Sequence, residues 1–207
     1  MMANSLVDSL LKVCEKMTNL VYLNMLWLGF SLLGFVVLGV SPATTAVIHI
    51  MRKQRQQPNS QLALLKEFKT IYRARFIESN KIGLLLIVVL IGLLVSGIVM
   101  AETNAPFLFK SMFIFSLSGF MLITLLAFPI HERKQTGPLY TTQLALFLGL
   151  SHLPYLLLTV VALIVVVVLF GRFPLMMLFF SASLPLAIVV SLSERLLNRY
   201  DLGVDEK

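Results

Sequence analysis

The chain has 207 residues and a formal net charge of +7, with 58% hydrophobic and only 13% charged residues. Soluble globular proteins are about 45–50% apolar and about 25% charged, so this composition excludes an ordinary soluble domain. Five windows without Asp, Glu, Lys or Arg hold 134 of the 207 residues: 17–51, 82–101, 111–131, 135–171 and 173–193. Because about 20 apolar residues cross a bilayer as a helix, the sequence predicts an all-α, polytopic membrane helix bundle.

The N-terminal quarter is predicted to combine an amphipathic helix with the first membrane span. Residues 5–19 place apolar side chains on one face, which is typical of an interfacial helix, and the first span covers about 20–40. Serine is a preferred N-cap and proline favours the first helical position, so Ser41 and Pro42 predict a new helix start. We expect 42–56 to be a short amphipathic helix that leaves the bilayer. The alternative is a re-entrant hairpin that returns the chain to the same side.

The basic segment within 41–81 is predicted to hold a second amphipathic helix at about 61–79. Its basic face consists of Lys66, Lys69 and Arg73, and an apolar stripe lies beside it: Leu65, Phe68, Tyr72 and Phe76. An anionic leaflet attracts such a face, so anionic membrane lipid is an expected partner. The alternative is that this helix packs against the protein's own helix ends.

Four further spans complete the expected bundle of about five transmembrane helices plus interfacial helices. They cover about 82–100, 110–130, 150–170 and 174–193, and the whole chain, 1–207, forms a single membrane domain. The window 135–171 is too long for one span. It predicts a helix that begins near Pro138 and bends at Pro154, because an internal proline removes a helical hydrogen bond.

The distribution of lysine and arginine predicts an orientation. With five spans, thirteen of the 17 basic residues share one side, and four lie on the other: Lys12, Lys16, Lys110 and Arg172. The positive-inside rule then places the N-terminus outside and the C-terminus in the cytoplasm. The net positive charge is explained by this distribution, so nucleic acid is not an expected partner. If 41–51 re-entered the membrane, the distribution would have to be counted again.

Motifs for catalysis, metal binding and cofactor binding are absent from the sequence, so no catalytic, metal-ligating or cofactor-binding residue is predicted. His49, His131 and His152 lie on separate segments without metal-ligand spacing. Asn24 is expected to form an interhelical hydrogen bond and Trp27 to anchor or pack the first span. A candidate structural motif comprises Asn24, Trp27, Ser41, Pro42 and Pro154.

Several local motifs together resemble a known family. They are Asn24-Met25-Leu26-Trp27, the block from Ser41 to Ala46, the helix carrying Phe68 and Phe76, Ser151-His152-Leu153-Pro154, and Leu196-Leu197-Asn198-Arg199-Tyr200. The chain resembles the YesL-like family of bacterial integral membrane proteins of unknown function. The resemblance implies five to six spans in the bacterial cell membrane. Because members are often encoded beside sugar-binding and sugar-importing systems, it also implies an accessory role in carbohydrate uptake.

Three functions are compatible with these observations. The first is a non-enzymatic membrane protein that is accessory or regulatory to carbohydrate uptake and binds sugar importer subunits. The second is a small oligomeric transporter or channel. The third is a lipid-directed membrane enzyme that uses His131, Glu132 or His152. A polar cavity lined by Asn24, Thr44, Ser96 or Thr124 would favour the transporter, whereas a dry bundle would favour the accessory protein.

Overall fold

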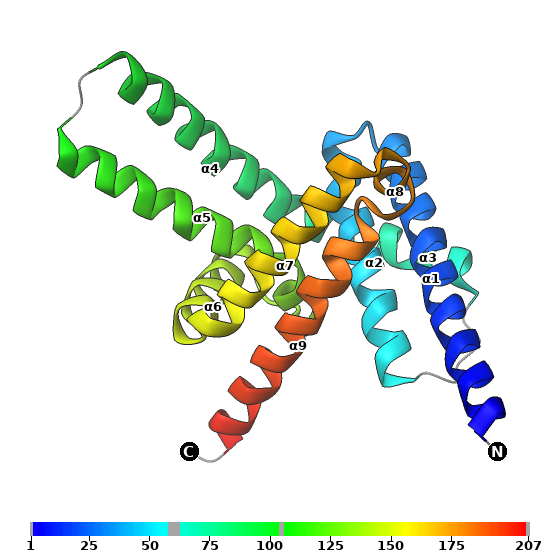
Figure 1. The fold of residues 1–207 in the computed structure, drawn as a ribbon. Coiled ribbons are helices and arrows are strands. Elements are labelled where there is room, and N and C mark those ends of the chain that lie inside the picture. The colour runs from blue at the N-terminus through cyan, green and yellow to red at the C-terminus, as the bar shows by residue number, and fades with distance from the viewer. Residues whose placement is uncertain (1, 58–62, 104–105, 206–207) are drawn as a thin grey trace.

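The structure is a computed structural model that describes residues 2–57, 63–103 and 106–205, and within these ranges it contains helices and no strand. The prediction of an all-α protein is confirmed. In chain order the elements are α1 (Met2–Leu33), α2 (Val37–Gln56), α3 (Leu64–Ala74), α4 (Phe76–Glu102), α5 (Phe107–Lys134), α6 (Pro138–Ser151), α7 (Leu153–Arg172), α8 (Pro174–Phe180) and α9 (Ser183–Asp205). Figure 1 shows α4 and α5 as a long antiparallel hairpin that projects from the remaining helices.

The first two helices form a hairpin, so the expected continuous span at 20–40 is wrong. The chain turns at 34–36, where Phe35 and Val36 have positive φ angles of 56° and 60°. A side chain on Gly34 would collide with the Gly39 backbone, so glycine at these positions lets the two helix ends meet. The expected helix start at Ser41 and Pro42 is also wrong, because the turn closes earlier and Pro42 lies inside α2.

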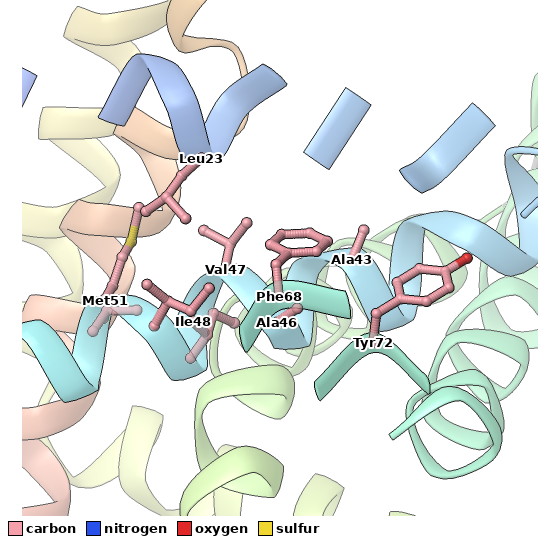
Figure 2. Packing of buried hydrophobic residues seen from close by; sticks show 10 residues of the cluster. Leu23, Ala43, Ala46, Val47, Ile48, Met51, Phe68 and Tyr72 are labelled. Atoms are coloured by element: carbon pink, nitrogen blue, oxygen red, sulfur yellow. The ribbon is translucent and has the colours of Figure 1, made fainter. Parts of the chain in front are cut away.

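The segment 42–56 is helical as expected, but it is a central helix instead of an interfacial one. Helix α2 contacts α1, α3, α4, α5 and α9. Its buried side chains pack with Leu23 of α1, Phe68 of α3 and Val190 of α9. Figure 2 shows Phe68 beside Ala46 and Val47 of α2. The apolar face of the segment 42–56 is therefore covered by the protein's own helices.

Three helices are long and apolar enough to cross a membrane: α4, α5 and α7. A fourth candidate is the pair α8 and α9, whose axes are bent by 57° at the break between them. These four correspond to the spans expected at 82–100, 110–130, 150–170 and 174–193. Among the described residues the structure thus provides three spans, or up to four, where the sequence predicts about five.

Of the two prolines in the window 135–171, one acts as predicted and the other does not. Pro138 begins α6 as expected, directly after Gly137. Pro154 does not bend a continuous helix, because α6 ends at Ser151 and Pro154 lies in the first turn of α7. A proline costs little in a first helical turn, where its missing N–H has no intrahelical partner. The predicted bend is therefore a break at His152.

Candidate functional site

Asn24 joins the first helix to the break between α8 and α9. Its side chain is completely buried. The amide nitrogen donates a hydrogen bond to the Leu178 carbonyl at 2.8 Å, and the amide oxygen accepts one from the Ala182 N–H at 2.9 Å. The same oxygen accepts from the Ser183 N–H at 3.3 Å. Asn24 therefore satisfies backbone groups that the break leaves without helical partners, as the prediction of an interhelical hydrogen bond requires.

Trp27 begins a second set of polar contacts, which lies around α2. Its indole N–H donates to Thr44 Oγ1 at 3.0 Å. The neighbouring Thr45 donates to the Ser41 carbonyl at 3.1 Å and accepts a hydrogen bond from Ser79 of α4 at 2.9 Å. Trp27 and the block from Ser41 to Thr45 thus hold α1, α2 and α4 together. These motif residues contact one another and have a structural role. Pro154 is not part of this group, because it lies at the start of α7.

A network of charged side chains joins α2, α3, α5 and α9. Arg52 binds the Glu132 carboxylate and also donates from Nε to Glu194 Oε1 at 2.5 Å. His49 Nδ1 lies 2.8 Å from the second Glu132 oxygen. The Glu132 side chain is only 8% exposed. Both oxygens of this carboxylate therefore have partners on α2.

The network continues toward solvent along α2. Lys53 Nζ lies 2.6 Å from Glu67 of α3, and Arg55 donates to Ser191 Oγ of α9 at 2.6 Å. Burial opposes the charge of Arg52, but its two carboxylate partners outweigh this effect and raise the pKa of the guanidinium above its ordinary value. Burial lowers the pKa of Arg55. These groups neutralise one another where four helices meet.

The remaining histidines do not join this network. His131 is buried, and its Nδ1 lies 2.9 Å from the Thr136 carbonyl, while its Nε2 has no hydrogen-bond partner. His152 occupies the break between α6 and α7, and its Nδ1 also lacks a hydrogen-bond partner. Among the described residues, no group of three or more His, Cys, Asp or Glu side chains is arranged to hold a metal ion.

A cavity of about 630 Å³ lies between α3 and the turn that joins α1 and α2. Two of the three predicted basic-face residues, Lys69 and Arg73, line it, and Lys66 does not. Tyr72, between them, donates a hydrogen bond to the Phe30 carbonyl at 3.2 Å, and burial raises the pKa of its phenol. The rest of the wall is apolar: Phe30, Leu33, Gly34, Phe35, Leu38, Leu65 and Phe76.

The sequence identified the basic face but not the cavity or the charged network. Lys69 and Arg73 were recognised by their spacing on one helix. The network could not be predicted from the sequence because Arg52, Glu132 and Glu194 are separated by more than 60 residues along the chain. The one available signal was that all three lie just beyond the ends of charge-free windows. They follow the first, third and fifth windows, and the ends of every second window lie on the same side if successive windows run in opposite directions.

Comparisons with known proteins place the chain in a family. The family model described as "Protein of unknown function, DUF624" matches residues 20–97. "Uncharacterized protein YteU" of Bacillus subtilis (strain 168) is 30% identical over 178 residues, which cover 84% of this chain and 79% of that protein. "Uncharacterized protein YesL" of the same strain is 27% identical over 93% of this chain and 91% of its own length. No solved structure matches significantly. The chain therefore belongs to the YesL-like family of unknown function, DUF624.

Proposed function

We propose that this protein is a non-enzymatic integral membrane protein that is accessory to carbohydrate uptake and acts by binding subunits of a sugar importer. The observation that carries the non-enzymatic part is the charged network. Arg52 bonds to both Glu132 and Glu194 and so joins three helices, which supports a role in holding the helices together. The link to carbohydrate uptake rests on the family resemblance.

The alternative, a small oligomeric transporter or channel, has less support. The four residues that would line a polar path each have a separate hydrogen-bond partner. Asn24 bonds to the break before α9 and Thr44 accepts from Trp27, whereas Ser96 and Thr124 donate to carbonyls of their own helices at 2.8 and 2.9 Å. Because each of these side chains is satisfied inside the bundle, their arrangement favours a structural role over a shared polar path.

Co-purification tests the proposed partner. The full chain carries a tag, is expressed from its own promoter, and is cross-linked in intact cells before extraction into a mild detergent. We expect importer subunits to be enriched over a tagged membrane protein of similar size. Deletion of the gene should slow growth on one or more sugars of a panel. Absence of importer subunits together with unchanged growth refutes the accessory role, and sugar flux into proteoliposomes that hold only this protein favours the transporter.

We further propose that the protein lies in the bacterial cell membrane with both termini in the cytoplasm. The sequence placed the N-terminus outside because it assumed one crossing at 20–40. The hairpin of α1 and α2 instead supports the alternative, in which the chain returns to the side where it began, and Figure 1 shows both termini at one end of the molecule. This orientation places Lys12 and Lys16 in the cytoplasm, so only Lys110 and Arg172 of the basic residues lie outside. It therefore fits the positive-inside rule more closely than the orientation predicted from five spans.

The cysteine at position 14 makes this orientation measurable. It is exposed, and the chain has one cysteine in all. A membrane-impermeant maleimide should label Cys14 only after the cells are permeabilised. In a Cys14→Ser background, Arg172→Cys should be labelled in intact cells. Labelling of Cys14 in intact cells contradicts the proposed orientation.

A further inference from the structure

We propose that the cavity between α3 and the α1–α2 turn is a binding site for one anionic phospholipid of the surrounding bilayer. Lys69 and Arg73 hold the headgroup phosphate, and the apolar wall takes the upper part of an acyl chain. The volume of about 630 Å³ lies within the range of about 300–1,000 Å³ that is typical of ligand sites. This inference does not rest on the proposed role in carbohydrate uptake.

The two basic residues are placed to share one anion. They are four residues apart on α3, so their side chains leave the helix on the same face, about 5–6 Å apart at Cβ. Both are exposed, and neither forms a salt bridge or side-chain hydrogen bond with another residue in the part of the chain that the structure describes. By contrast, the nearby Lys53 and Arg75 have carboxylate partners. The cavity therefore offers two cations that the protein leaves unneutralised.

The opposite wall identifies the ligand as a lipid. The turn between α1 and α2 is apolar, and Leu33 and Phe35 are 74% and 89% exposed. Exposed apolar side chains that lie together mark a contact with a membrane or with another protein. The backbone N–H groups of residues 34–36 donate to carbonyls of α1, so the turn meets the requirement that hydrocarbon places on a backbone. The basic helix beside it is typical of the headgroup region. A cavity with one wall in each region matches a molecule that has an anionic head and an apolar chain.

The shape of the site is fixed by contacts that do not use the cations. Tyr72 attaches α3 to the Phe30 carbonyl at 3.2 Å, and its buried ring packs on Phe30 with centroids 5.1 Å apart. A side chain on Gly34 would lie 2.6 Å from the Tyr72 hydroxyl. Removal of the two positive charges therefore leaves the walls in place.

Lipid titration with a matched control tests the proposal. The full chain in a non-ionic detergent is titrated with phosphatidylglycerol or phosphatidylcholine of identical acyl chains, and bound lipid is counted by native mass spectrometry. Two basic residues at a membrane surface correspond to a preference for the anionic lipid of about 30-fold. We expect Lys69→Ala/Arg73→Ala to abolish that preference. The control Lys66→Ala/Lys81→Ala removes the same charge from exposed positions outside the cavity and should retain it.

Further variants and competitors separate the possible results. Lys69→Arg/Arg73→Lys keeps both charges and should keep the preference, while circular dichroism verifies that every variant is helical. If the cavity variant retains the preference, or if the control loses it to the same extent, the site is not the one proposed. Displacement of phosphatidylglycerol by glycerol 3-phosphate, which has no acyl chain, also overturns the proposal because it identifies a soluble anion as the ligand.

Discussion

The contact between Asn24 and the break before α9 leads to a quantitative prediction. Asn24→Ala removes the partners of the Leu178 carbonyl and the Ala182 N–H, which are bonded at 2.8 and 2.9 Å. The Asn24 side chain is fully buried, so water does not replace it. Each buried polar group left unsatisfied costs about 1–3 kcal/mol. For two such groups the free energy of unfolding should therefore fall by about 2–6 kcal/mol, more than the average of about 0.6 kcal/mol for interhelical hydrogen bonds in membranes.

Unfolding in detergent micelles, followed by circular dichroism, measures this loss. Asn80→Ala is the matched control, because Asn80 is also buried but donates to the Phe76 carbonyl of its own helix at 2.9 Å. Hydrogen exchange adds a local measurement, since the amides of residues 178–183 should exchange faster in Asn24→Ala only. If Asn24→Ala is no less stable than the control and exchange at 178–183 is unchanged, the hydrogen bonds do not hold the break.

Other predictions concern the charged network and the hairpin. Arg52→Ala leaves the Glu132 and Glu194 carboxylates without their shared counter-charge, so the free energy of unfolding should fall by about 3–5 kcal/mol in the same assay; a loss below about 1 kcal/mol contradicts a structural role. Gly34→Ala should lower the melting temperature because the new methyl group collides with the Gly39 backbone. Gly92→Ala meets nothing within 4 Å and should leave the melting temperature unchanged or raise it, so equal effects of the two glycine variants refute this reasoning.

The charge-free windows after residue 81 predicted the long apolar helices well. Helices α4, α5 and α7 lie where the sequence places spans. A charge-free run of this length in a bilayer must satisfy its backbone N–H and C=O groups internally, and a helix does so. The first window was harder to interpret. Residues 17–51 are uniformly uncharged, so composition did not reveal the turn at 34–36. That turn depends on the close approach of Gly34 to Gly39 across the hairpin, which is a tertiary contact.

Much less of the site could be derived from the sequence. The basic face of α3 follows from helical spacing, which is a local property. Asn24 stands out because it is a polar residue near the start of an apolar segment, which is also visible locally. The partners of these residues come from distant parts of the chain. Asn24 meets residues more than 150 positions away, and Arg52 meets Glu132 and Glu194. Spacing along one helix carries no information about such pairs.

The sequence by itself determined that this protein is helical and membrane-embedded, and it identified the cations of α3, because hydrophobicity and helical periodicity are written in neighbouring residues. The tertiary structure decided what those elements do together. In the structure the expected first span is part of a hairpin, and α2 is a central helix. The arginine of α2 forms ion pairs with glutamates of α5 and α9. Lys69 and Arg73 line the same cavity as the apolar turn between α1 and α2. The physical reason is that the close approach at glycines, the ion pairs of buried carboxylates and the walls of the cavity all join residues of different helices. They depend on which helix faces meet, and neighbouring residues in the sequence do not determine that.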